Sequence, residues 1–281
     1  MSIIAISGKI GSGKDTVGKI ILYYTFCKKG FGGAKASVED CVKWLSGEYP
    51  GTLVEDISDW QIKKFANKLK DIICLLIGCT REQLEDQDFK NRELGEEWWY
   101  WKVYSDIIND KFELIPYSGE NGFYNRKSNY KGHSLKKLTP RLLLQLLGTE
   151  CGRNIIHPNI WVNSLFSEYK SCGCDSGKTK TSDCWDSCNY PEKGDNWVIT
   201  DLRLPNELKA VKDRGGISIR VRRFVGKPML TGTGSNPIII EEHPSETALD
   251  NAIFDYTIDN NGTIEELIRK VKEILIKEKI I

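Results

Sequence analysis

The stretch SIIAISGKIGSGKDT, residues 2–16, decides the fold. Its apolar start predicts a buried strand, and its glycine-rich remainder predicts a phosphate-binding loop that leads into a helix. Small residues let successive backbone N–H groups turn toward a polyphosphate at the positive end of that helix, where Lys14 can bridge the outer phosphates. The residues expected to hold a nucleotide are Gly11, Ser12, Gly13, Lys14, Asp15 and Thr16.

The loop departs at one position from the usual G-x-x-x-x-G-K-[ST] pattern. Asp15 stands where the hydroxyl ligand of magnesium is expected, and Thr16 follows it. Nucleotide binding survives this change. We expect Asp15 and Thr16 to order Mg²⁺ either directly or through water.

Length and charge place the chain among ordinary enzymes. Its 281 residues, 40% of them apolar, suffice for one domain with or without insertions. The formal net charge of +1 gives no reason to expect nucleic acid or an anionic membrane as partner. The absence of a basic leader or long apolar run predicts a cytoplasmic protein. Single cysteines are expected to be reduced thiols: Cys27, Cys41, Cys74, Cys79 and Cys151.

Four further cysteines lie close together, at Cys172, Cys174, Cys184 and Cys188. Four thiolates could hold a tetrahedral zinc ion, although C-x-C and C-x-x-x-C are poor matches to the usual C-x-x-C spacing. The alternative is a surface insertion over residues 171–195, since the stretch is rich in Gly, Ser, Asp and Lys.

Strand and helix patterns alternate along the chain, which predicts an α/β fold with a parallel sheet flanked by helices. Apolar spacing predicts a helix over residues 57–77. Residues 81–135 lack a clear sheet period, so 86–135 is expected to be an inserted subdomain. A further helix is predicted from Thr139-Pro140 to Gly148, because it begins with a capping residue and proline.

Polar residues on and after that helix suggest a ligand site. Arg141 and Gln145 share one helix face, and Thr149, Glu150 and Arg153 follow. The alternative is that Arg141 pairs with a carboxylate such as Glu150 for structural reasons.

A second apolar strand, residues 197–203, ends in Asp201 and Arg203. This is the carboxyl edge of the sheet, where open α/β proteins bind ligands. Asp201 could hold magnesium or its waters, and Arg203 could reach a phosphoryl group. A strand is also predicted over residues 217–222, with Arg220, Arg222 and Arg223 as solvated charges by default.

Five sequence blocks together resemble the deoxynucleoside monophosphate kinase family of bacteriophages and related viruses. They span most of the chain in the expected order, with residues 34–60, 86–135 and 171–195 as departures. The blocks are Gly8 to Thr16, Phe65-Ala66…Leu69-Lys70, Thr139-Pro-Arg141…Gln145…Gly148-Thr149-Glu150…Arg153…Trp161-Val162, Asp201-x-Arg203-x-Pro205-Asn206-Glu207 and His243-x-Ser245-Glu246.

This resemblance implies a P-loop NTPase fold with inserted lid or substrate segments, and transfer of the ATP γ-phosphoryl group to a deoxynucleoside monophosphate (dNMP) with Mg²⁺ as cofactor. It also implies a homodimer and, for a viral chain, the host-cell cytoplasm. Lys14, Arg141, Arg153, Asp201 and Arg203 would be catalytic, with Asp201 assisting at the metal. The acceptor would contact Lys70, Arg141, Gln145, Gly148, Thr149, Glu150, Arg153 and Trp161.

Two other functions fit parts of the pattern. Another small-molecule P-loop kinase, such as dephospho-coenzyme A kinase, also begins with a strand, loop and helix and takes a phosphorylated acceptor. A regulatory ATP-binding protein that hydrolyses ATP slowly could use the insertions as interaction surfaces. The base preference, the choice between deoxyribose and ribose, and the role of the His243 block are left open by the residues.

Overall fold

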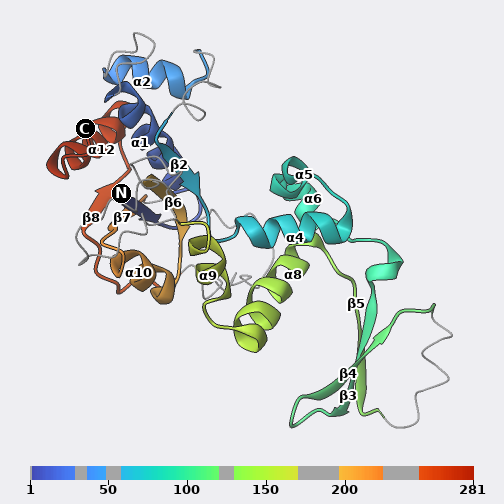
Figure 1. Ribbon diagram of the computed structural model, residues 1–281. Helices are drawn as coiled ribbons and strands as arrows, with labels where there is room; N and C mark the ends of the chain where they lie inside the picture. Colours follow the sequence, from blue (N-terminus) through green and yellow to red (C-terminus); the bar gives the residue numbers. More distant parts are fainter. Residues whose placement is uncertain (1, 29–36, 49–57, 120–129, 170–195, 224–246) are drawn as a thin grey trace, which may run out of the picture. The chain divides into compact units, whose positions relative to one another are not determined.

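The computed structural model describes residues 2–28, 37–48, 58–119, 130–169, 196–223 and 247–281 (Figure 1). They divide into two units, one made of Met1–Phe65 and Val162–Ile281 and the other of Ala66–Trp161. We call the first the parallel-sheet unit and the second the inserted unit. The cysteine loop 171–195, the His243 block and the glycines at 30–33 lie outside the described residues.

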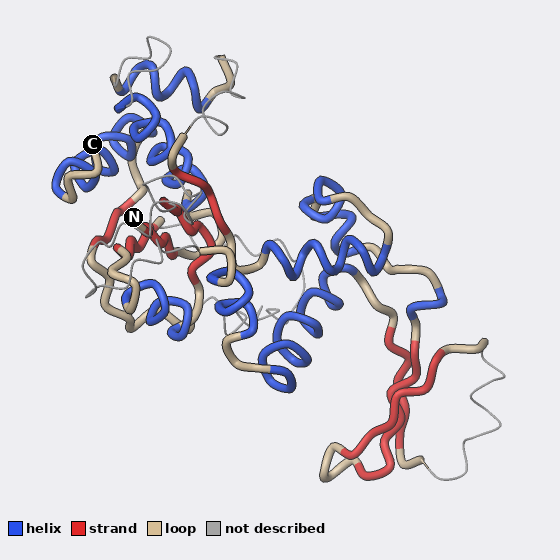
Figure 2. The backbone as a smooth tube through the Cα atoms, in the orientation of Figure 1, coloured by secondary structure: helices blue, strands red, loops and turns tan. Residues whose placement is uncertain are grey.

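Five parallel strands form the sheet of the parallel-sheet unit, in the order β2-β6-β1-β7-β8. Figure 2 shows the strands of both units in red. Central β1 pairs on both sides, with Ile4 opposite Val198 on β6 and Ile217 on β7. The bounds are β1 Ile3–Ser7, β2 Trp60–Lys63, β6 Asn196–Leu202, β7 Ile217–Arg222 and β8 Tyr256–Asp259. The predicted α/β parallel sheet is thereby confirmed.

Side chains of β1 alternate between two hydrophobic cores, because successive residues of a strand point to opposite faces. Ile4 and Ile6 pack in the core formed with α1, α2 and α12, whereas Ile3 and Ala5 pack in the core formed with α9 and α10. Burial on both faces explains why the strand is continuously apolar. The helices are α1 Lys14–Lys28, α2 Val38–Leu45, α9 Ile160–Phe166, α10 Pro205–Lys212 and α12 Ile264–Lys277.

The inserted unit combines short helices with an antiparallel sheet. The Thr139 hydroxyl caps helix α8 by accepting from the Leu142 backbone N–H at 3.1 Å, as predicted. Its helices are α4 Asn67–Ile77, α5 Arg81–Glu85, α6 Gln87–Asn91 and α8 Pro140–Gln145, followed by a π-helical segment, Leu146–Ile156. Its strands, in the order β4-β3-β5, are β3 Tyr100–Asp106, β4 Lys111–Pro116 and β5 Gly132–Lys136.

One secondary-structure prediction is wrong in part. The predicted helix over residues 57–77 contains a strand at Trp60–Lys63, and its helix begins only at Asn67. Trp60 and Ile62 alternate with polar residues, and this segment pairs with β6, where Ile62 lies opposite Val198. Residues 81–135 show no clear sheet period in the sequence, yet β3 and β4 lie there and β5 begins there, because their small core around Val103 and Ile115 is too limited to give a clear alternation.

Three features limit the kinds of site available in the described part of the chain. None of its helices has the length and apolar character needed to cross a membrane. In the same part, no group of three or more His, Cys, Asp or Glu residues is placed so that it could hold a metal ion. The five single cysteines are free thiols, as expected, with Cys41 fully buried.

Candidate active site

The glycine-rich loop follows β1 and leads directly into α1, as predicted. Lys14, the first residue of α1, turns its side chain back over the loop. Its Nζ donates hydrogen bonds to the carbonyl oxygens of Gly8 at 2.6 Å and Lys9 at 2.8 Å. The lysine charge is therefore held above the loop, where a polyphosphate would sit.

Asn260, between β8 and α12, fixes the loop from a distant part of the sequence. Its Nδ2 donates to the Ser12 carbonyl oxygen at 2.9 Å. A Cβ atom added to Gly13 would lie 2.5 Å from that Nδ2, and Gly13 has φ of +98°, so only glycine fits. The sequence gives no sign of this contact, because nothing local links Asn260 to a loop 248 residues away.

Ser12 provides a buried hydroxyl inside the loop. The residue is 2% exposed, and its Oγ has no hydrogen-bond partner among the described residues. Buried hydroxyls are normally paired, so this atom is suited to donate to a ligand oxygen. With Lys14 and the glycines, Ser12 makes the loop a chemically suitable cradle for phosphate.

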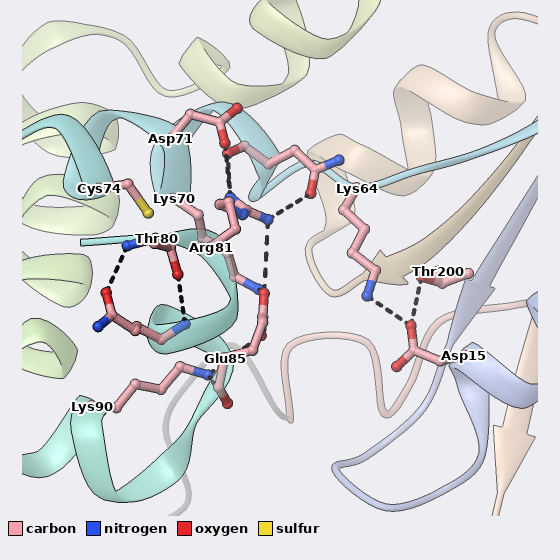
Figure 3. Close-up of polar contacts among 12 residues, drawn as sticks. Asp15, Lys64, Lys70, Asp71, Cys74, Thr80, Arg81, Glu85, Lys90 and Thr200 are labelled. Atoms are coloured by element: carbon pink, nitrogen blue, oxygen red, sulfur yellow. Dashed lines mark hydrogen bonds and ion pairs between the residues drawn. The ribbon is translucent and has the colours of Figure 1, made fainter. Parts of the chain in front are cut away.

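Asp15 on α1 contacts a residue of β6 and a residue just after β2, beside the loop (Figure 3). Its Oδ1 lies 2.8 Å from the Lys64 Nζ and accepts a hydrogen bond from the Thr200 hydroxyl at 3.0 Å. Burial raises the pKa of the Asp15 carboxyl, but Lys64, Thr200 and the charge of Lys14 together lower it below its ordinary value. Asp15 is therefore an ionised carboxylate at neutral pH. Sequence reasoning missed Lys64, because it lies in the stretch predicted to be helical.

Asp201 and Glu207 order the backbone at the end of β6. The Asp201 Oδ1 accepts the Phe65 backbone N–H at 2.8 Å, which holds the chain just after Lys64. The Glu207 carboxylate is buried and accepts the backbone N–H groups of Arg203 at 2.9 Å and Leu204 at 3.0 Å. Asp201 and Arg203 thus lie on a fixed turn, and Glu207 is a positioning residue there.

The expectation that Arg220 on β7 is a solvated charge is wrong. Arg220 is 9% exposed, and its guanidinium donates to the Ser7 hydroxyl at 3.0 Å and to Asp250 at 2.6 Å. Ser7 immediately precedes the loop, so this ion pair supports the loop base. Arg222 and Arg223 are exposed, as expected.

The residues expected at the acceptor, apart from Arg203, all lie in the inserted unit. Arg141 does not pair with Glu150: its Nε and Nη2 donate to the amide oxygens of Asn91 and Gln87, both at 2.7 Å. Glu150 instead accepts from Asn154 at 3.3 Å.

Packing also fixes two other residues of that set. The Trp161 Nε1 donates to the Gly148 carbonyl oxygen at 2.8 Å, and both residues are buried. Lys70 is not solvated, because its Nζ lies 2.5 Å from Glu85 Oε1. Gln145 is exposed, whereas Thr149 and Arg153 are half-buried.

Comparison with known proteins gives one informative relationship. No protein-family model matches the chain. The chain is 22% identical over 274 residues, covering 88% of its own length and 84% of the relative's, to the deoxynucleoside-5′-monophosphate kinase of Escherichia phage T5. The parallel sheet and phosphate-binding loop agree with a phosphate-loop nucleoside monophosphate kinase fold. The chain is thus a distant homologue of the phage T5 enzyme.

Proposed function

We propose that the chain is a deoxynucleoside monophosphate kinase, which transfers the γ-phosphoryl group of ATP to a dNMP and releases ADP and the diphosphate. The observation that carries the proposal is the phosphate-binding loop with Lys14 held over it. The similarity to the phage T5 enzyme supports the same activity, since it covers 88% of the chain and 84% of the relative.

The loop would hold ATP through backbone N–H groups, Lys14 and the Ser12 hydroxyl. Lys14 can exchange its two loop carbonyl partners for phosphate oxygens with little movement, because both carbonyls belong to the loop itself. Phosphoryl transfer depends mainly on positioning and charge neutralisation, which a lysine and ordered N–H groups supply.

Asp15 and Thr16 are suited to hold magnesium with the help of nucleotide phosphates. Mg²⁺ usually keeps several waters and takes only one or two protein carboxylates, so the lack of a larger acidic cluster among the described residues is compatible with it. Bound Mg²⁺ would neutralise charge on the phosphate oxygens. Asp201 would act less directly, since one of its oxygens already holds the Phe65 N–H.

The acceptor would contact residues of the inserted unit. Arg141 presents a guanidinium oriented by two amide oxygens, a geometry suited to a phosphate. The remaining acceptor contacts are proposed for Lys70, Gln145, Gly148, Thr149, Glu150, Arg153 and Trp161. Arg153 and Arg203 would neutralise charge on the acceptor phosphate or the migrating group.

Release of ADP from ATP and Mg²⁺ tests this proposal, with dAMP, dCMP, dGMP, dTMP and their ribose analogues supplied singly. Lys14→Ala should lower acceptor-dependent turnover at least tenfold, which corresponds to about 1.4 kcal/mol of transition-state stabilisation. Lys19→Ala is the matched control, because Lys19 lies on the same helix and is exposed.

The outcomes separate the alternatives. If dephospho-coenzyme A stimulates ADP release and no nucleotide does, the acceptor assignment is wrong. If no acceptor stimulates ADP release while ATP still binds, a regulatory ATP-binding protein is favoured. Light scattering of the purified protein would test the proposed homodimer separately.

A further inference from the structure

A second cluster of charges lies wholly within the inserted unit, where α4, α5 and α6 meet (Figure 3). Glu85 is at its centre. Its Oε1 lies 2.5 Å from Lys70 Nζ and 3.7 Å from Arg81 Nη2, and its Oε2 lies 3.5 Å from Lys90 Nζ. One carboxylate therefore contacts three cations from three helices.

The cluster carries more positive than negative charge. Arg81 also lies 3.1 Å from Asp71, while Arg141 donates to the two neutral amides already described. The ion pairs set three cationic side chains, Lys70, Arg81 and Lys90, against two carboxylates. Arg141, whose charge acts on Lys90, adds a fourth cation, so the four cations exceed the two carboxylates by two charges. A structural ion-pair network has no need of such an excess, whereas a site for a dianion does.

Lys90 is the most shielded member of the cluster. Its side chain is only 11% exposed. Burial lowers the pKa of its ammonium group, and the charges of Lys70 and Arg141 lower it further, while Glu85 opposes them. The group is thus a desolvated cation facing other cations, and an added anion would stabilise it.

Glu85, in contrast, is open to solvent on one side. Its side chain is 51% exposed. Burial raises the pKa of its carboxyl, but the hydrogen bond and charge of Lys70, with the charges of Lys90 and Arg81, lower it overall. Glu85 is therefore an ionised counter-ion at neutral pH, and its exposed side lets the carboxylate turn toward water when another anion arrives.

We propose that Lys70, Arg81 and Lys90, next to Arg141, form the site for the 5′-phosphate of the acceptor nucleotide, and that this phosphate displaces Glu85 as their counter-ion. The inference rests on the proposed function and adds Arg81, Lys90 and Glu85 to the acceptor residues. A nucleoside phosphate offers three oxygens and nearly two negative charges, so it matches the cluster better than one carboxylate.

Calorimetric titration of the full-length protein with the preferred dNMP tests the inference. Glu85→Gln keeps the side-chain shape but removes the competing charge, so binding should tighten about threefold to tenfold. Lys90→Met removes a buried cation, so binding should weaken at least tenfold. The matching deoxynucleoside, which lacks the phosphate, should bind all proteins equally.

The control is the exposed pair formed by Lys137 and Glu93, 3.1 Å apart in the same unit. Lys137→Met and Glu93→Gln make the same chemical changes and should leave dNMP affinity unchanged. Glu85→Gln and Lys90→Met both break the ion pair between Glu85 and Lys90, but they should shift the dNMP affinity in opposite directions. If the pair had only a structural role, both variants would shift the affinity in the same direction. If Lys90→Met does not fold, Glu85→Gln decides the question alone.

Unchanged or weaker dNMP binding by Glu85→Gln overturns the inference. Inorganic phosphate that binds the wild-type protein as tightly as the dNMP does would overturn the assignment to the acceptor. If the dNMP is bound and phosphorylated but both variants bind it like wild type, only this inference fails. If the wild-type protein neither binds nor phosphorylates any dNMP, the proposed function fails instead.

Discussion

Replacing Arg220 with methionine should destabilise the parallel-sheet unit by about 2–3 kcal/mol. The guanidinium lies 2.6 Å from Asp250 Oδ1 and 3.0 Å from the Ser7 hydroxyl. Methionine keeps much of the apolar stem but removes the charge and the donors. Asp250 and Ser7 would then lose their shared partner beneath the phosphate-binding loop.

The burial of the two side chains sets this magnitude. Removing one partner of a fully buried ion pair costs roughly 3–5 kcal/mol, whereas an exposed pair contributes at most about 1 kcal/mol. The Arg220 side chain is 11% exposed and that of Asp250 is 39% exposed. Water can therefore solvate part of the abandoned carboxylate, which places the loss between the two limits.

Urea unfolding followed by circular dichroism and tryptophan fluorescence measures the loss. With a slope of about 2 kcal/mol per molar urea, the midpoint of Arg220→Met should fall by about 1–1.5 M. Arg222→Met is the matched control, two residues along the same strand and exposed, and should shift stability by less than about 0.5 kcal/mol. If the two units unfold separately, only the transition of the parallel-sheet unit should move.

A double variant shows whether the uncompensated charge is the cause. Asp250→Asn should cost less in the Arg220→Met background than in the wild type, with a coupling of about 1–2 kcal/mol. Equal midpoints for Arg220→Met and Arg222→Met would refute the reasoning. So would strict additivity of the Arg220 and Asp250 substitutions, because independent effects cannot come from one ion pair.

Two further predictions concern the loop. Lys64→Met should raise the pKa of the Asp15 carboxyl, because burial raises that pKa and Lys64 leads the effects that oppose it. The ionised Asp15 carboxylate stabilises the folded state at pH values above its unfolded-state pKa, and this contribution is lost as the pH falls through its lower folded-state pKa. In Lys64→Met the loss of stability should therefore begin at a higher pH. A carbon-13 NMR titration that gives the same Asp15 pKa in Lys64→Met and wild type would contradict this prediction. Gly13→Ala should weaken the binding of an ATP analogue more than Gly11→Ala does. Both glycines have positive φ, but only a Cβ atom at Gly13 would collide with the Asn260 side chain. Equal affinities of the two variants in calorimetry would argue against the close contact between Gly13 and Asn260.

Local patterns could be interpreted correctly where the contacts that stabilise a structure lie close together in the sequence. The strand, loop and helix of residues 2–28 follow from one continuous stretch, because the glycines and Lys14 act on neighbouring backbone. Thr139 caps its helix as expected, and Thr263 caps α12 in the same way, each accepting a hydrogen bond from a residue three positions on.

Contacts between residues that are far apart in the sequence could not be predicted from local patterns. Trp60–Lys63 was included in a helix predicted from the apolar spacing of the residues that follow it, yet it forms a strand because it pairs in parallel with β6. Arg220 alternates in strand fashion like an ordinary surface residue, and only Ser7 and Asp250, which are remote in sequence, make it a buried ion-pair partner.

The sequence by itself predicted phosphate binding, since Lys14, the glycines and the Asp201-x-Arg203 block have the residue types and spacing expected for it. Only the tertiary structure decided which other side chains contact the predicted residues and form charge clusters. Lys64 reaches Asp15, and Lys90 reaches Glu85, because folding brings separate elements together. The physical reason is that charge and burial act through space, so their partners are determined by packing rather than by order along the chain.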